Sequence, residues 1–367
     1  MANSFITIKN IARMTLPRLV ENLVMPALCY RDYSEAYSDL GNVIQVKKPV
    51  VFEAKDFKVG DTVTDQDIVE SSVDVTLDKI ATIDVSINAL EAATNWSEEK
   101  FMREFIEPAA VALAQKINKA GLEQYVDIPN LIGTAGTTPS ALTDFSAARK
   151  FLNKAKAPMS ERYAIWDVDA DAKFTEIPNL TRVNEAGTSE ALREGQIGRI
   201  YGLDNFMTQA IEAHELAGAG TVLIDGAATK GATMIHVDGV TTALAVGDMF
   251  TIAGDTTKYT VNKAGALDTA DQDLYITPAL QKNAADNAAI TLISTATVNN
   301  LVFHRNAIAF VTRPLNAPAG GYTTSNGEYS LRVVRGYDMS TKSEKLSMDV
   351  LYGYKVVYPE LAARYLG

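Results

Sequence analysis

The chain has 367 residues, 47% of them hydrophobic and 22% charged, so it can form a large core and has the composition of an ordinary globular protein. Its formal net charge of −11 argues against a broad nucleic-acid-binding face, because phosphate binding needs clustered lysine and arginine. The single cysteine, Cys29, excludes an intrachain disulfide and fits a reducing compartment. No run approaches the ~20 apolar residues of a membrane span, so we expect no membrane association.

Residues 4–29 have apolar side chains at spacings of three and four, which predicts an amphipathic helix. Pro17 is expected to split this helix, and Thr15 could cap its second half. An N-terminal arm with an apolar face is expected to pack against another protein surface, because an exposed apolar face is unfavourable in water. The sequence leaves open whether that surface is the chain's own core or a neighbouring subunit.

Residues 43–88 favour β-structure around a polar centre. Residues 43–51 form one extended run, and apolar residues alternate from Val73 to Ile87. The polar stretch between them predicts a long hairpin that projects from the subunit. We interpret its charged residues as candidate contacts with neighbouring subunits, although a solvated loop explains any one of them equally well. The candidates are Lys47, Lys48, Asp56, Lys58, Asp61 and Asp65.

Residues 95–121 form the clearest predicted helix. Asn95 and Glu98 match an N-terminal capping box. Pro108 is expected to kink the middle of the helix, and Gly121 is a reasonable C-cap. At ~1.5 Å per residue such a helix approaches 40 Å, long enough to serve as the backbone of a subunit.

Helices and strands alternate over residues 141–217. We predict a helix over 141–155, a buried strand over 162–168 and a helix over 169–177. The run DVDAD at 167–171 resembles the start of an EF-hand calcium-binding loop. However, Ala172 and Pro178 occupy the positions where such a loop needs glycine and glutamate. A strand followed by an Asp-capped helix fits better.

The composition changes abruptly after residue 199. No arginine occurs over residues 200–304, and no glutamate over residues 216–327. Six short strand candidates lie in this window, which predicts a small all-β module inserted into an α/β host. They are residues 221–224, 232–237, 248–253, a strand centred on Tyr259, 273–278 and 289–293. After the module, apolar residues at even positions from Leu346 to Val356 predict a long central strand.

No motif supports catalysis, a metal or a cofactor. His214, His236 and His304 share no ligand spacing, and neither a phosphate loop nor a nucleophile motif occurs. The run NNLVFHRNAIAFVTR at 299–313 places His304 among apolar residues, without a recognisable partner for acid–base chemistry. We interpret it as strand, turn and strand, with Asn306 in the turn.

Three stretches resemble the major capsid proteins of tailed double-stranded DNA bacteriophages. NLVFHRNAIAFVTRPL at 300–315 is similar to the segment that follows their inserted domain, and SEKLSMDVLYGYKVVYPELAARYLG at 343–367 is similar to their C-terminal strand. TALAVGDMFTIAG at 242–254 resembles a strand of the inserted β-barrel in the short-tailed, Salmonella-phage-type branch. The order of elements also agrees over nearly the whole chain. One departure is that 225–234 is short where this branch has a long loop.

The resemblance implies the α+β tailed-phage capsid fold with an inserted small all-β barrel. Its expected parts, in chain order, are an N-terminal arm at 1–42, an extended loop with flanking strands at 43–94, a spine helix with the peripheral domain and first axial part at 95–218, the inserted barrel at 219–295, and the second axial part with the C-terminal peripheral strand at 296–367.

The resemblance also implies a structural, non-enzymatic protein. It would assemble with itself as hexamers and pentamers of an icosahedral head, in the host cytoplasm, and would become part of the virion capsid. Scaffolding and portal proteins would be its partners, and the shell would enclose DNA without sequence-specific binding. The alternatives are an encapsulin-like nanocompartment shell, an α/β enzyme with a β-barrel module, and another virion component.

Overall fold

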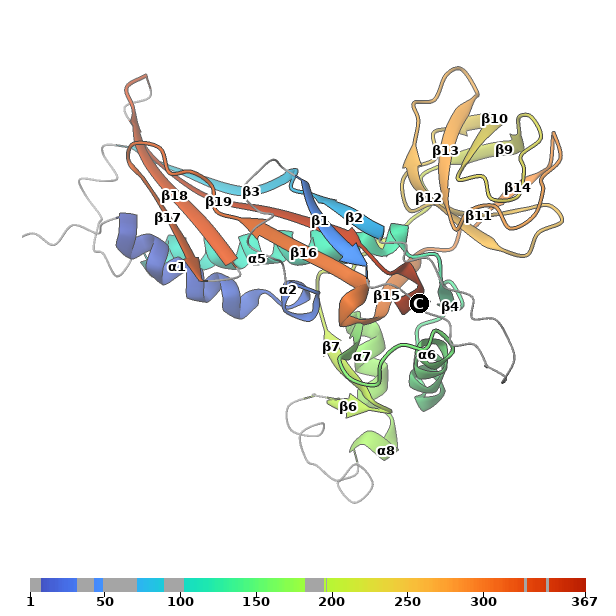
Figure 1. Ribbon diagram of the computed structural model, residues 1–367, viewed down its shortest axis with the longest axis horizontal. Coiled ribbons are helices and arrows are strands. Elements are labelled where there is room, and N and C mark those ends of the chain that lie inside the picture. Colours follow the sequence, from blue (N-terminus) through green and yellow to red (C-terminus); the bar gives the residue numbers. More distant parts are fainter. Residues whose placement is uncertain are drawn as a thin grey trace, which may run out of the picture. The chain divides into compact units, whose positions relative to one another are not determined.

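The computed structural model describes residues 8–31, 43–48, 71–88, 102–181, 195, 197–326, 329–340 and 343–367. The chain folds into two units, each formed by segments that are distant in the sequence. Unit 1 comprises residues 1–117 and 308–357, and unit 2 comprises residues 118–307 and 358–367. The fold is mixed α+β, as predicted, and strands outnumber helices in the described part of the chain (Figure 1).

Unit 1 is built on an antiparallel sheet whose central strand is β19 (Ser343–Val356). The strand order is β16-β19-β18-β17, with β3 (Lys79–Asn88) also paired to β19. The other strands are β16 (Ile308–Arg313), β17 (Gly321–Asn326) and β18 (Tyr329–Asp338). Every even residue from Leu346 to Val356 is buried, which confirms the predicted period-two central strand.

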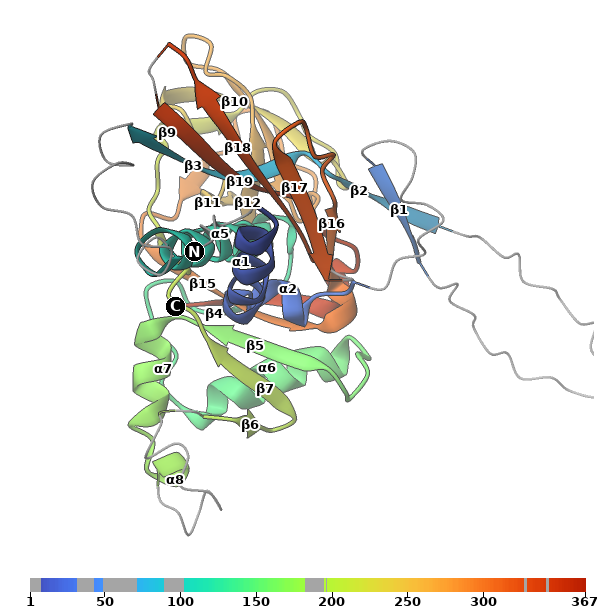
Figure 2. The same cartoon turned by 90° about the vertical axis from the view of Figure 1, so that its left-hand side faces the viewer.

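The N-terminal arm forms helix α1 (Ile8–Asn22) and the short helix α2 (Met25–Leu28). Helix α1 packs on β17 and β18 (Figure 2), so its apolar face is covered by the chain's own sheet. The predicted break at Pro17 is wrong, because α1 runs through it, and Thr15 donates back to the Ile11 carbonyl (2.8 Å) instead of capping a second helix. A proline removes only one helical hydrogen bond, and burial of the surrounding apolar face outweighs that loss.

A two-stranded ribbon is formed by β1 (Val43–Lys48) and β2 (Ser71–Thr76), which pair antiparallel with Val43 opposite Thr76. The continuous strand predicted from Val73 to Ile87 is therefore two strands, because β2 pairs with β1 whereas β3 pairs with β19. The division falls at residues 77–78, next to Lys79, where the alternation has its one exception. The predicted polar tip, residues 57–70, lies outside the described residues.

The predicted long helix is found with different ends. A π-helical turn, η2 (Met102–Ile106), leads into α5 (Glu107–Leu122), which is followed by the 3-10 helix η3 (Glu123–Asp127). The predicted cap at Asn95 lies outside the described residues. Pro108 stands in the first turn of α5, where a missing N–H costs little, and not in a kinked middle. The α-helix ends at Leu122, one residue after the predicted end, so Gly121 belongs to its last turn and is not its C-cap.

Unit 2 contains a mixed sheet with the order β4-β20-β15-β5-β7-β6, and β8 pairs with β15. Its strands are β4 (Leu131–Gly133), β5 (Arg162–Trp166), β6 (Arg199–Ile200), β7 (Leu203–Met207), β8 (Ala213–His214), β15 (Thr297–His304) and β20 (Ala362–Leu366). Strand β20 was not predicted as a separate strand, and it returns the end of the chain from unit 1 to unit 2.

Helices α6 (Leu142–Lys154), α7 (Val168–Thr175) and α8 (Pro178–Thr181) also belong to unit 2 (Figure 1). The first two confirm the helices predicted over 141–155 and 169–177. They pack on one face of the sheet around an aromatic cluster in which Phe145 meets Trp166 edge to face at 5.5 Å. Tyr365 of β20 belongs to the same cluster.

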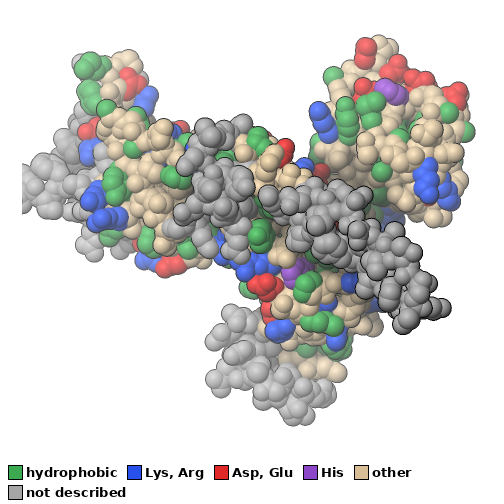
Figure 3. Space-filling view, viewed as in Figure 1, with side chains coloured by type: hydrophobic (Ala, Val, Ile, Leu, Met, Phe, Trp, Pro, Cys, Tyr) green, Lys and Arg blue, Asp and Glu red, His purple; other side chains and the backbone are tan. Residues whose placement is uncertain are grey.

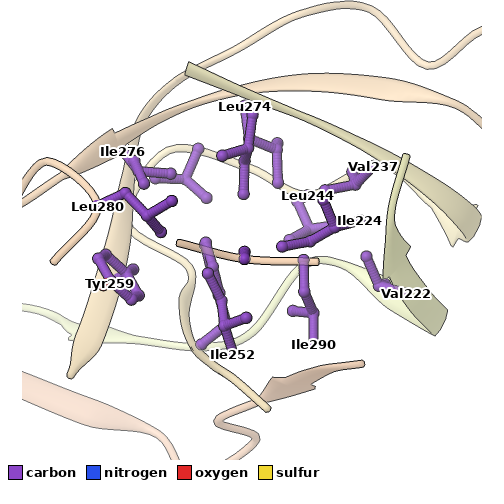
Figure 4. Close-up of a cluster of buried hydrophobic side chains, with 14 of the residues drawn as sticks. Val222, Ile224, Val237, Leu244, Ile252, Tyr259, Leu274, Ile276, Leu280 and Ile290 are labelled. Atoms are coloured by element: carbon purple, nitrogen blue, oxygen red, sulfur yellow. The ribbon is translucent and has the colours of Figure 1, made fainter. Parts of the chain in front are cut away.

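All six strands predicted for the all-β module are present. They are β9 (Ala219–Ile224), β10 (Met234–Thr242), β11 (Met249–Ile252), β12 (Lys258–Ala264), β13 (Gln272–Thr277) and β14 (Ile290–Leu292), in the sheet order β14-β11-β12-β13-β10-β9. A bridge between Leu223 of β9 and Ala289, the residue before β14, brings the two edges of the sheet together, so the sheet closes on itself. Its interior is filled by aliphatic side chains such as Val237, Leu274 and Ile276 (Figure 4).

Candidate functional site

His304 does not have the surroundings of a catalytic base. Strand β15 ends at His304, a 3-10 turn covers Arg305–Ala307, and β16 follows, which confirms the predicted strand, turn and strand. The imidazole is 2% exposed and its Nδ1 accepts from the N–H of Asn306 (3.2 Å). Burial lowers the pKa of His304, and the nearby carboxylate of Glu161 is paired with Arg305 at 2.8 Å. The histidine therefore serves as a neutral side chain of the core.

Cys29 and the aspartates at 167–171 also have structural surroundings. Cys29 is completely buried, and burial raises the pKa of its thiol, which disfavours a nucleophilic thiolate. Asp167 caps α7 by accepting from the N–H groups of Asp169 (3.2 Å) and Ala170 (3.3 Å), as predicted. Within the described part of the chain, no group of three or more His, Cys, Asp or Glu residues is arranged to hold a metal ion.

The ribbon carries two of the predicted contact residues. Lys47 and Lys48 lie at the end of β1 that leads toward the predicted tip, opposite Ser72 and Ser71 of β2. Asp56, Lys58, Asp61 and Asp65 lie outside the described residues. Val75 of β2 is fully buried and β2 contacts β19, so the other end of the ribbon is anchored in unit 1.

The described strands and helices also contain a polar junction that sequence reasoning did not find. Asp248, the residue before β11, is completely buried and accepts from His214 Nε2 (2.9 Å). It also accepts from three backbone N–H groups, those of Ala217, Gly218 and Ala245, at 3.0–3.1 Å. Burial alone would raise the pKa of Asp248, but these hydrogen bonds together lower it. One carboxylate thus joins the inserted barrel to the segment through which the chain enters it.

Arg364 extends the junction from the host sheet. It is fully buried in β20, its Nη2 donates to the Thr260 hydroxyl of β12 (2.7 Å), and its guanidinium lies 5.8 Å from the centre of the Tyr125 ring. Burial lowers the pKa of Arg364 to about 10. Gly247 packs against Tyr125 and His214 so closely that a β-carbon there would come 2.5 Å from the Tyr125 hydroxyl. No local pattern predicts this junction, because its residues are far apart in the sequence.

The described residues include no helix that is both long and apolar enough to cross a membrane. The described residues thus form a packed arm, an anchored ribbon and a barrel that is joined to its host by buried polar contacts.

Comparisons with known proteins agree with this architecture. The family model described as "P22 coat protein - gene protein 5" matches residues 1–266. The structure is similar to a solved structure of Mycobacterium phage Che8, with 18% identity, a TM-score of 0.54, and coverage of 94% of this chain and 90% of that one. It is also similar to the capsid of Ralstonia phage GP4, with 8% identity, a TM-score of 0.51, and coverage of 94% and 87%. No curated protein matches the sequence.

Proposed function

Because the chain belongs to the P22 coat protein family and is a structural major capsid protein, we propose that its copies assemble into a closed icosahedral head around packaged double-stranded DNA. Hexamers and pentamers form the shell, and scaffolding and portal proteins assist assembly in the host cytoplasm. The family match over residues 1–266 is the observation that carries this proposal. Closed shells repeat heterologous contacts, and many modest contacts together give a stable particle.

The expected parts of the subunit follow the order of the chain. Residues 1–42 are the arm, 43–94 the extended loop, 95–218 the spine helix with the first host part, 219–295 the inserted barrel, and 296–367 the second host part. The anchored ribbon supports the extended loop, since β2 holds its base while Lys48 lies toward its tip. The loop charges at Lys47, Lys48, Asp56, Lys58, Asp61 and Asp65 pair with opposite charges on adjacent subunits.

The inserted barrel assists folding of the subunit and decorates the exterior of the head. Its closed sheet and separate aliphatic core support the first role, because such a module can form its own contacts early. Between Ala219 and Thr295 it holds four lysines and eight aspartates, a net charge of −4. Such a surface suits solvent better than confined DNA.

Electron microscopy of the purified full chain, with light scattering for mass, tests the assembly proposal. Closed shells or curved sheets are the expected result, either from the chain alone or after co-expression with the scaffolding protein of the same phage. Uniform monomers under both conditions would overturn it. Shells that contain a protein cargo and never DNA would favour a nanocompartment instead.

A further inference from the structure

Helix α6 and the turn after it carry four exposed cations: Arg149, Lys150, Lys154 and Lys156. No aspartate or glutamate occurs between Phe145 and Ser160. We call these four residues the α6 cationic face. Such a cluster stands out in a chain whose net charge is −11.

Within the part of the chain that the structure describes, none of these four cations forms an ion pair. Other cations of unit 2 do, such as Lys119 with Glu212 (2.7 Å), Lys173 with Glu176 (3.0 Å) and Arg305 with Glu161 (2.8 Å). Helix stabilisation does not explain the cluster either, because Arg149 and Lys150 precede the last turn and Lys156 follows the helix.

A fifth positive charge lies beneath this face. Arg162 is 2% exposed and donates only to neutral oxygens, those of Pro158 (2.6 Å), Asn153 (2.8 Å) and Ala157 (2.7 Å). Burial and the neighbouring Arg149 both lower the pKa of Arg162, as expected where two cations lie close together. These bonds also hold the turn that presents Lys156. Among the described residues, no carboxylate bonds to Arg162, so its charge adds to the positive charge of the α6 cationic face.

The kind and spacing of these residues suit a row of phosphates. From Arg149 to Lys156 the helix and turn advance by about 10 Å at ~1.5 Å per residue, while duplex DNA carries one charge per ~1.7 Å of its axis. Three of the four residues are lysines, which act as point charges on flexible stems. Such side chains contact phosphates without reading bases.

The α6 cationic face and the acidic barrel lie on opposite sides of the unit 2 sheet. Tyr365 of β20 packs in the core under α6 and α7, whereas its neighbour Arg364 points the other way and reaches Thr260 of the barrel. Acidic side chains gather at one end of the barrel (Figure 3), and the barrel carries a net charge of −4 between Ala219 and Thr295. A barrel on the outside of a shell therefore places α6 on the side facing the contents.

We propose that the α6 cationic face contacts the phosphate backbone of the enclosed double-stranded DNA, an inference that rests on the proposed function as a DNA-filled shell. One subunit makes a weak contact, and the repetition of that contact over the shell makes it effective. The acidic remainder of the chain keeps DNA from adhering elsewhere.

Fluorescence anisotropy with the purified full chain and a random duplex of about 30 base pairs tests this contact over a salt series. Four phosphate contacts predict that affinity falls about tenfold for each doubling of salt. The variant Arg149→Gln, Lys150→Gln, Lys154→Gln, Lys156→Gln should lose most of the binding and of its salt dependence. The matched control, Lys230→Gln, Lys258→Gln, Lys263→Gln, Lys282→Gln, removes four charges from the barrel and should bind as the wild type does.

The double variant Lys150→Gln, Lys154→Gln should lose about half of the salt dependence, and it replaces the fourfold variant if that variant fails to fold. Equal losses in the α6 and barrel variants would overturn the proposal, since net charge alone would then explain binding. Binding of a polyglutamate peptide without binding of duplex would also overturn it, and would indicate an acidic protein partner. Shells seen by electron microscopy without any duplex binding would overturn this contact but leave the proposed assembly intact.

Discussion

The backbone of Gly353 lies so close to Thr76 that a β-carbon on the glycine would clash with the Thr76 carbonyl oxygen. Gly353 belongs to β19, the central strand of unit 1, and Thr76 is the last residue of β2 in the ribbon. A side chain at this position would push the two segments apart. Because Gly353 has no β-carbon, the base of the ribbon can lie directly against β19.

Gly353→Ala should therefore destabilise unit 1 and loosen the ribbon. Because the nearest atoms belong to backbone, relief of the clash needs a backbone shift, and we expect a loss of roughly 1–3 kcal/mol in the free energy of unfolding. Urea denaturation followed by circular dichroism measures it. The control is Gly336→Ala in β18, where nothing lies within 4 Å of an added β-carbon. Equal effects of the two substitutions would contradict the close-contact argument.

The packing of α1 on its own sheet predicts unequal effects of two substitutions in that helix. Leu19 is 1% exposed and Met14 is 56% exposed. Leu19→Ala should lower the free energy of unfolding by roughly 2–5 kcal/mol, because it leaves a cavity between α1 and the sheet. Met14→Ala should change it by about 0.5 kcal/mol or less. A small effect of Leu19→Ala in the unassembled subunit would show that α1 docks on a neighbour instead.

Cys29 should be unreactive in the folded subunit. The thiol is fully buried and burial raises its pKa, so both access and thiolate formation are suppressed. A disulfide reagent such as DTNB should react at least about a thousandfold more slowly with the native chain than with the chain in urea. The native chain exposes the thiol only during rare openings of the structure around Cys29. Since Cys29 is the only cysteine, the rate reports opening of unit 1 alone. Rapid labelling under native conditions would disprove the burial.

Asp248→Asn should weaken the junction between the barrel and its host. The hydrogen bonds to Asp248 lower its pKa below the ordinary 3.8, so its stabilisation is present above that value and is lost as pH falls through the lowered pKa. At neutral pH we expect the variant to lose roughly 2–3 kcal/mol, since charge-assisted hydrogen bonds are removed from a buried site. As pH falls below 3.8 and through the lowered pKa of Asp248, the difference from wild type should shrink.

Chemical denaturation at several pH values measures this difference. Asp225→Asn is the control, because Asp225 is an exposed barrel aspartate. A difference between wild type and Asp248→Asn that grows on acidification would reverse the expected sign and refute the role of the carboxylate.

Local sequence patterns predicted most elements, and they failed where tertiary contacts decide. The barrel strands and the even-numbered residues of β19 were predictable because burial on one face imposes a period of two. The alternation from Val73 to Ile87 could not reveal that β2 and β3 pair with different partners, since the pattern is the same on both sides of the break. Pro17 predicts a break in the helix, but α1 continues through it because the helix packs on β17 and β18.

The functional surfaces were predictable to different degrees. The charges of the α6 cationic face are visible in the sequence, but their lack of ion pairs within the described residues is a property of the folded chain. Asp248 and His214 are 34 residues apart and belong to no motif, so only the fold brings them together. The strand, turn and strand around His304 were predictable, because apolar runs on both sides mark buried strands and Asn306 marks the turn.

The last prediction concerns residues 57–70, the expected tip of the extended loop. Deleting them should leave a folded subunit, because the ribbon is anchored through β2, which lies outside the deleted residues. The deletion should nevertheless reduce the yield of closed shells at least about tenfold, since each lost contact is repeated at every copy. The milder variant Asp61→Asn, Asp65→Asn should act in the same direction, whereas Asp225→Asn, Asp286→Asn on the barrel removes equal charge and should assemble normally. Light scattering and electron microscopy give the yield, and normal shells from the deletion variant would show that the tip is only a solvated loop.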